Sequence, residues 1–105
     1  MPNYRIDLEE RAQMFKALSN PHRLALFERL VRCCTPGTVC STEVALRHTV
    51  GELGKGLDIA PSTLSHHLKE LHRAGLVQMQ RNGRQIECWV APATLKRLAS
   101  LFASE

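Results

Sequence analysis

Hydroxyl, imidazole and cationic side chains gather on residues 61–84, with the sequence PSTLSHHLKELHRAGLVQMQRNGR. Four lysines and arginines stand there against one carboxylate, whereas residues 1–20 carry equal numbers of each sign. Positive charge concentrated on one segment favours a polyanionic partner such as nucleic acid. The alternative is a charged face that meets only solvent.

The polar residues of this segment have the chemistry to contact a duplex. Short hydroxyls near a helix N-terminus can meet base edges or phosphates, and lysines and arginines suit backbone phosphates. Arginines beside a hairpin tip could enter an adjacent minor groove. The candidate DNA contacts are Ser62, Thr63, Ser65, His66, Lys69, Arg73, Arg81 and Arg84. Ser62 could instead be an ordinary first-turn residue, and His67, beside apolar Leu64 and Leu68, favours packing or a hydrogen-bonded role.

Three cysteines within eight residues, Cys33, Cys34 and Cys40, could bind a soft ion. Thiolates prefer such ions, and a turn at Pro36 could fold Cys40 back to form a trigonal set suited to arsenite or antimonite. A disulfide that includes Cys40 is one alternative, and one buried thiol with incidental loop thiols is another. Cys88 stands apart in a strand-like segment, which indicates a packed residue.

Helical spacing and capping residues predict the helices that precede this segment. One face of a first helix carries Leu8, Ala12, Phe15 and Leu18. Asn20-Pro21 predicts the start of a second helix. Its expected buried stripe is Leu24, Phe27, Leu30 and Val31. Thr49 and Glu52 have capping-box spacing for a short helix, 50–57, that buries Val50, Leu53 and Leu57.

The remaining elements surround the basic segment. A helix from Pro61 to residue 73 should turn Leu64, Leu68 and Leu71 inward, and Gly75 should follow it in a left-handed conformation. Strands are expected over 76–81 and 85–91, joined by a type I′ turn at Asn82-Gly83. Pro92 can open a last helix, 93–103. Its apolar stripe comprises Leu95, Leu98, Ala99 and Phe102.

Size and composition favour one compact domain over residues 1–105, with a net charge of +4. No apolar run approaches a membrane span, and the N-terminus lacks the pattern of a signal peptide. We therefore expect a cytoplasmic protein with reduced thiols. No nucleophile–base set, Gly-rich phosphate loop, HExxH spacing or C-x-x-C is present, so we do not expect an enzyme or a permanent cofactor.

Taken together, NPHRL at 20–24, STLSHHL at 62–68, LHRAGLV at 71–77 and RNGR at 81–84 resemble the ArsR/SmtB family of bacterial repressors. The resemblance covers roughly residues 8–103. It implies a mostly α fold with a small β-hairpin wing, a winged helix-turn-helix of order α-α-α-α-β-β-α. It also implies that helix 61–73 enters the major groove. The family dimerises through its first and last helices, so a homodimer on an inverted-repeat operator is expected.

The chain departs from the family in three places. Ala60 stands where the family often has Ser, which removes an N-cap and one possible phosphate contact. Residues 49–53 lack the Cys-x-Cys pair of many members, and residues 92–105 lack the histidines of a last-helix zinc site. We therefore expect neither of these two family site types. The cysteine cluster leads us to predict a repressor that arsenite or antimonite releases from DNA through Cys33, Cys34 and Cys40. A thiol-redox-responsive or effector-independent regulator is the alternative, and a protein-interaction module is a more distant one.

Overall fold

A computed structural model of the chain describes residues 4–32 and 48–102. Its helices and strands are, in order, α1 (Tyr4–Leu18), α2 (Pro21–Val31), β1 (His48–Thr49), α3 (Val50–Gly54), α4 (Pro61–Arg73), β2 (Gln78–Asn82), β3 (Gln85–Trp89) and α5 (Pro92–Ala99). The mostly helical fold with a β-hairpin confirms the predicted class. In the described part of the chain, no helix is both long and apolar enough to cross a membrane.

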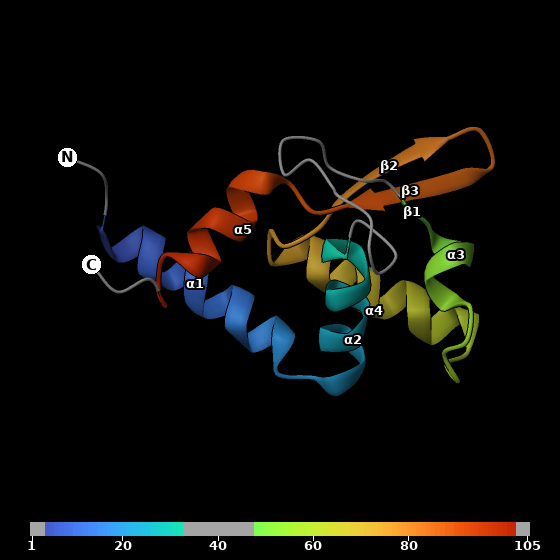
Figure 1. Cartoon of the computed structure of the whole chain (residues 1–105), viewed down its shortest axis with the longest axis horizontal. Helices are drawn as coiled ribbons and strands as arrows, with labels where there is room; N and C mark the ends of the chain where they lie inside the picture. Colours follow the sequence, from blue (N-terminus) through green and yellow to red (C-terminus); the bar gives the residue numbers. More distant parts are fainter. Residues whose placement is uncertain (1–3, 33–47, 103–105) are drawn as a thin grey trace.

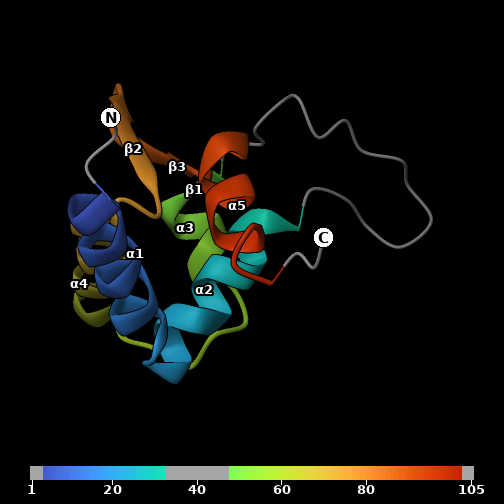
Figure 2. The same cartoon turned by 90° about the vertical axis from the view of Figure 1, so that its left-hand side faces the viewer.

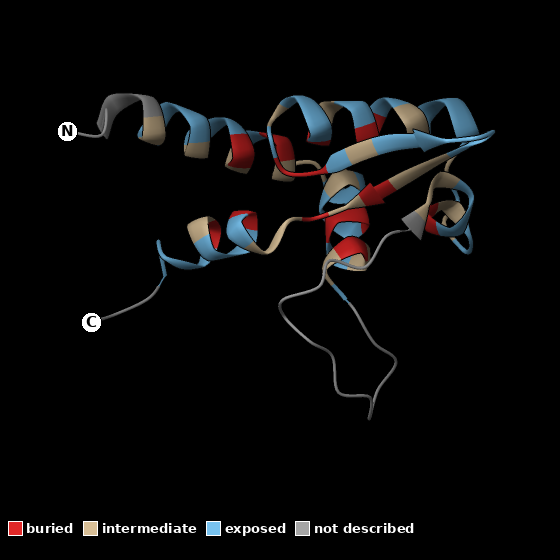
Figure 3. Ribbon diagram, turned by 90° about the horizontal axis from the view of Figure 1, so that it is seen from above, coloured by how far each residue is buried: buried red, intermediate tan, exposed pale blue. Residues whose placement is uncertain are grey.

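Helix α2 is the central element, because it packs against α1, α3, α4 and β3. Helices α1 and α4 lie along the same side of the molecule, and the sheet and α5 lie on other sides of α2 (Figures 1, 2 and 3). The three strands form one antiparallel sheet in the order β1-β3-β2. The hydrophobic core lies between these helices and the sheet, and its fully buried side chains are those of Leu26, Leu53, Leu68, Leu71, Leu76, Val77 and Cys88. The core thus fixes α4 against the centre of the molecule.

The predicted start of α2 is confirmed, but part of its predicted stripe is wrong. The Asn20 side-chain oxygen accepts hydrogen bonds from the backbone N–H groups of His22 (2.9 Å) and Arg23 (3.2 Å). Leu26 is buried in place of Leu24, which is 41% exposed. Leucine occurs on both sides of this helix, so spacing alone does not choose the inward one.

The apolar face predicted for α1 is only partly buried. Met14 and Ala17 are the buried positions, whereas Leu8 and Ala12 are exposed. The N-terminal half of α1 extends past α2 and α4, and Leu8 there is 43% exposed (Figure 3).

The Thr49 capping box is confirmed, but α3 ends earlier than predicted. Thr49 Oγ1 accepts from the Glu52 N–H at 3.2 Å, and Glu52 Oε1 accepts from the Thr49 N–H at 3.0 Å. The helix stops at Gly54, not residue 57, because Gly56 takes a positive φ of 76° that turns the chain away. A Cβ on Gly54 would lie 2.8 Å from Leu64 Cδ2, so glycine allows α3 to approach α4 closely.

Arg29 of α2 holds the end of α3. Its Nη1 donates to the backbone carbonyls of Leu53 (3.1 Å) and Lys55 (2.5 Å). We expect Arg29→Met to lower the free energy of unfolding by about 1–3 kcal/mol, because charged hydrogen bonds to two helix-end carbonyls are lost. Urea unfolding measures this change. Arg32→Met is the matched control, since its exposed pair with Glu28 spans 3.9 Å and should contribute less than about 0.5 kcal/mol.

The C-terminus of α4 is confirmed and has a complete Schellman motif. Gly75 has φ 82°, its N–H donates to the His72 carbonyl at 3.0 Å, and the Leu76 N–H donates to the Leu71 carbonyl at 3.0 Å. This geometry ends the helix and directs the chain into the hairpin.

The predicted hairpin turn is wrong by one residue. Asn82 pairs with Gln85, so the two-residue loop is Gly83-Arg84. Gly83 has φ 65°, and no described non-glycine residue has a positive φ, which fits a type II′ turn and excludes type I′. Arg84 therefore lies in the tip itself. The strands are also shorter than predicted, because buried Leu76 and Val77 precede β2 and Val90 follows β3.

Two features at the sheet and at α5 also differ from the prediction. Strand β1 was not predicted; it pairs with β3 through His48↔Cys88 and Thr49↔Glu87. Helix α5 ends at Ala99 instead of residue 103, and Phe102 beyond it is 75% exposed. Of the predicted α5 stripe, only Leu98 is buried.

Candidate nucleic-acid interface

One face of α4 presents polar side chains to solvent. Ser62, His66, Lys69 and Arg73 follow one another at i, i+4, i+7 and i+11 and are all exposed. That spacing places them in one row along the helix, which we call the α4 stripe. The opposite face buries Leu64, His67, Leu68 and Leu71, as predicted for the leucines. The stripe therefore lies on the solvent-facing side of a helix whose opposite face is packed into the core.

The wing lies beside one flank of the stripe. Ser65 and Arg84 line a hollow of about 300 Å³ together with Thr49, Gly51 and Ile86. Two predicted contact residues, one from α4 and one from the hairpin tip, are thus brought together over the start of α3. Arg81 is exposed on β2, opposite Ile86 of β3. It does not line this hollow.

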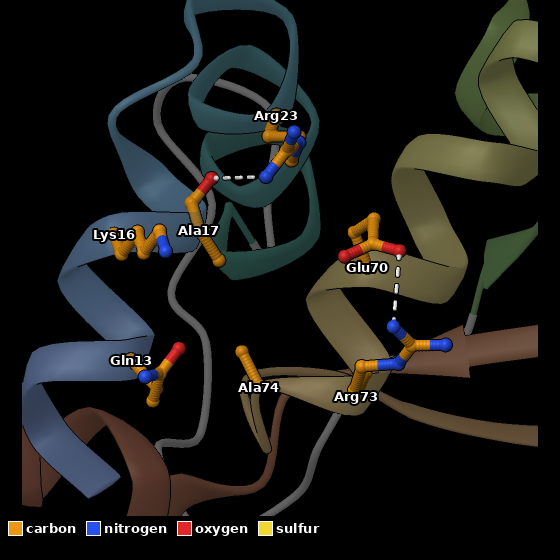
Figure 4. A pocket seen from close by; sticks show the side chains of 7 residues that line it. All are labelled: Gln13, Lys16, Ala17, Arg23, Glu70, Arg73 and Ala74. Atoms are coloured by element: carbon orange, nitrogen blue, oxygen red, sulfur yellow. Dashed lines mark hydrogen bonds and ion pairs between the residues drawn. The ribbon is translucent and has the colours of Figure 1, made fainter. Parts of the chain in front are cut away.

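Helix α1 lies beside the other flank of the stripe. Arg73 lines a second hollow, of about 390 Å³, with Gln13 and Lys16 of α1 and Arg23 of α2 (Figure 4). Glu70 also lines it, and its Oε1 lies 3.8 Å from Arg73 Nη1. Arg73 therefore stands apart from Ser65 and Arg84. Thr63, seven residues before Glu70, is exposed on this flank and lines neither hollow.

His67 joins α4 to α2, which confirms its predicted packing role. It is 7% exposed, and its Nδ1 accepts a hydrogen bond from Arg23 Nε at 3.3 Å. The same guanidinium donates through Nη1 to the Ala17 carbonyl at 3.4 Å, so Arg23 connects three helices. The His22 ring stacks on His67 with centroids 5.8 Å apart. Burial first, and then the positive charge of Arg23, lower the pKa of His67.

This arrangement makes stability depend on pH. The unfolded chain protonates the ring near pH 6.5, whereas in the folded chain the lowered pKa means that the ring takes up its proton only at a lower pH. The unfolded state therefore binds more protons, and the free energy of unfolding should fall as the pH drops below about 6.5. We expect His67→Asn, which keeps an acceptor without a titrating ring, to lose part of this dependence. Urea unfolding at pH 7.5 and 5.5 tests it; equal pH dependence in both proteins would contradict it.

His72 anchors the end of α4, a role that the sequence did not indicate. It is exposed, as predicted, but its Nδ1 lies 2.8 Å from the Val77 carbonyl oxygen. This hydrogen bond fixes the segment that leads into the wing. At the other end of α4, Ala60 makes no side-chain capping bond and Pro61 begins the helix.

The predicted ion site cannot be placed, because Cys33, Cys34 and Cys40 lie outside the described residues. Within residues 4–32 and 48–102, no three His, Cys, Asp or Glu side chains come together as a metal site. Cys88 is fully buried on β3, and burial raises the pKa of its thiol to about 11, which confirms the packed role. A thiol held neutral in the core is a poor ligand for a soft ion.

Comparisons with known proteins agree with this geometry. Residues 18–80 match a family described as a helix-turn-helix domain. An uncharacterized HTH-type transcriptional regulator, YceK of Bacillus subtilis, is 36% identical over 78 residues, which cover 74% of this chain and 67% of the relative. The biofilm growth-associated repressor of Xylella fastidiosa is 37% identical over 86 residues, 78% of this chain and 64% of the repressor.

A solved structure supports the winged-helix fold. The homodimeric winged helix-turn-helix domain Mb0332 from Mycobacterium bovis, a possible ArsR-family regulator, superposes with a TM-score of 0.69 at 22% identity. The match covers 97% of this chain and 82% of that domain. Helix α3, the connection to α4, α4 itself and the hairpin therefore correspond to the helix-turn-helix and its wing.

Proposed function

The chain belongs to the helix-turn-helix family whose model it matches, and on that premise we propose that it is an ArsR-type transcriptional repressor that binds an inverted-repeat operator as a homodimer. One observation carries the proposal: the α4 stripe is fully solvent-facing while the opposite face of α4 is locked into the core. Any amphipathic helix exposes a polar face, but this one combines a hydroxyl, an imidazole and two cations with no carboxylate. A protein-interaction module would favour apolar side chains there. We assign its action to the cytoplasm.

In this proposal α4 enters the major groove. Ser62, Thr63, Ser65 and His66 meet base edges or nearby phosphates, because they lie at or near the helix N-terminus. Lys69 and Arg73 contact backbone phosphates farther along the helix. Arg81 and Arg84 extend from the wing toward the adjacent minor groove. Repression follows if the bound protein covers the promoter.

The homodimer is supported by exposed apolar side chains on the first and last helices. Leu8 of α1 is 43% exposed, Leu95 of α5 is 36% exposed, and Leu101 and Phe102 just beyond α5 are more exposed still. Arg97 ties α5 to α1 through Asp7 (2.7 Å) and Glu10 (3.1 Å), and Phe15 meets Phe102 edge-on. Two helices joined in this way form one surface that a second copy can cover. The similar M. bovis domain is homodimeric.

Selection of bound duplexes from a random library tests the proposal. A two-fold dimer should enrich an inverted repeat whose half-sites are centred one helical turn, roughly 34 Å, or a multiple of it apart. Enrichment of a single half-site would contradict the dimer, and no enrichment would contradict specific DNA binding.

The second part of the proposal is the signal that releases the protein from DNA. Arsenite or antimonite binds Cys33, Cys34 and Cys40, and the bound ion weakens operator binding. Their spacing supports this role, and Cys88, the remaining cysteine of the chain, is fully buried. The segment that carries them joins α2 to α3, which packs on α4, so an ion held there would act on the DNA-reading helix. A redox switch through the same thiols is the alternative.

Fluorescence anisotropy on the selected operator distinguishes these signals. We expect arsenite to weaken operator binding by about 5–150-fold, the usual range of allosteric coupling. The Cys33→Ser/Cys34→Ser/Cys40→Ser variant should bind DNA normally and ignore arsenite, whereas Cys88→Ser should respond like the wild type. Release by peroxide but not by arsenite would favour the redox alternative, and an unchanged response in the triple variant would contradict a role for these thiols.

A further inference from the structure

We propose that the DNA-binding surface extends beyond α4 and the wing, to the hollow between α1 and α4, where Lys16 and Arg23 contact a backbone phosphate. This inference rests on the proposed function, because it adds a contact to the same complex. It assigns a role in DNA binding to residues of α1 and α2, outside the recognition helix and the wing.

The position of the hollow supports the proposal. Helices α1 and α4 lie along the same side of the molecule (Figures 2 and 3). Arg73, the last residue of the α4 stripe, lines the hollow, and the side chains of Gln13 and Lys16 line it from α1 (Figure 4). The stripe therefore leads directly into the hollow, so a duplex seated on the stripe would pass over it.

The charge of the hollow also fits a phosphate. Lys16, Arg23 and Arg73 line it against one carboxylate, Glu70. Among the described residues, none forms an ion pair with Lys16. Arg23 uses Nε and one Nη1 hydrogen inside the protein, and a guanidinium has five N–H donors. The wall between the cations is made of small side chains, Ala17 and Ala74, which leave room for a phosphodiester.

The shape of B-DNA explains why a second cationic hollow would be useful. The major groove is about 12 Å wide, and a backbone borders it on each side. The wing-side hollow, with Ser65 and Arg84, lies on one flank of α4, and the α1-side hollow lies on the other. A helix in the groove would thus have one cationic hollow near each strand. Contacts to both strands fix the register of the helix without reading sequence.

Lys16→Gln is the direct test, because Lys16 is exposed and Arg23 also holds His67. At 0.1 M salt we expect the variant to bind both operator and random duplex about 5–10-fold more weakly. Its salt slope should fall by about 1.8, because the dimer loses one phosphate contact, worth about 0.9, in each subunit. Glu70→Gln should act in the opposite direction, since it removes the one carboxylate among the described residues that line the hollow. A role limited to folding would not produce opposite effects from the two variants.

Arg32→Gln is the matched control, because it also removes one positive charge but at the C-terminal end of α2, away from Arg23. The DNA affinity and the salt slope of this variant should match those of the wild type. An unchanged slope for Lys16→Gln, with a wild-type chain that binds DNA, would overturn this inference alone. Failure of the wild-type chain to bind any duplex would overturn the proposed function as well. Free phosphate is the other ligand that this hollow could bind, and inorganic phosphate titrated at constant ionic strength tests for it. NMR shifts at Lys16, together with an unchanged salt slope for Lys16→Gln, would assign the hollow to free phosphate and overturn the DNA contact.

Discussion

Replacing Ser62 and His66 together with alanine should abolish the preference for operator over random duplex, while non-specific binding survives. Both side chains are exposed on the α4 stripe, near the helix N-terminus, where base edges are read. Each good base contact contributes about 1–3 kcal/mol of discrimination. The dimer loses two such contacts in each subunit, so the specificity ratio should fall at least about 900-fold. Competition anisotropy with operator and random duplexes measures the ratio.

Arg81→Gln/Arg84→Gln provides the contrasting result. Wing arginines are expected to act mainly on the backbone and the minor groove, so this variant should weaken binding to both duplexes and reduce the salt slope. The substituted residues of both variants, Ser62, His66, Arg81 and Arg84, are exposed, so the melting temperatures of both should match that of the wild type. If the α4 variant lost affinity for both duplexes equally, the stripe would bind phosphates without reading bases.

Placing carboxylates on the apolar surface of α1 and α5 should separate the dimer and, with it, operator binding. We expect Leu8→Asp/Leu95→Asp to sediment as a monomer at micromolar concentration. Each carboxylate that the interface would bury without a partner costs several kcal/mol, which disfavours association. Operator affinity should fall at least about 100-fold, because one half-site contributes only part of the contacts.

Leu24→Asp is the control for this experiment. Leu24 of α2 is 41% exposed, close to the 43% of Leu8, but it lies on neither α1 nor α5. This variant should remain dimeric and bind the operator. Circular dichroism of all three proteins should be alike, since none of these leucines lies in the buried core. A Leu8→Asp/Leu95→Asp protein that stayed dimeric would place the interface elsewhere.

The starts of α2 and α3 and the end of α4 could be predicted because their signals are local. Asn20 before Pro21, Thr49 with Glu52, and Gly75 after α4 each satisfy backbone groups within a few residues, so their types and spacing suffice. The α4 stripe was predicted for the same reason, because helical spacing alone puts its residues in one row.

Features that depend on distant partners could not be predicted in this way. Strand β1 has two residues and exists only through its pairing with β3. Asn82-Gly83 is compatible with more than one turn, and the register of β2 against β3 decides between them. The hydrogen bond from Arg23 to His67 joins residues 44 positions apart, so no local sequence pattern predicts it. The exposure of Leu8 and Leu24 shows that an apolar stripe does not by itself identify the core.

The candidate site, too, has a part that could be predicted locally and a part that depends on packing. The residue types of α4 and the wing predicted a DNA contact, and the geometry adds two hollows that flank the stripe. Ser65 with Arg84, and Arg73 with Lys16, are neighbours only because α3 and α1 pack on α4. Their DNA contacts stay predictions.

The most direct test of the central claim is the affinity of the purified chain for duplex DNA from upstream of its own gene, against a shuffled duplex, across several salt concentrations. We expect two copies of the chain to bind per site, the upstream duplex to be preferred, and the logarithm of the binding constant to fall linearly with the logarithm of salt concentration. Equal binding of the shuffled duplex, or an affinity that does not change with salt, would contradict the account.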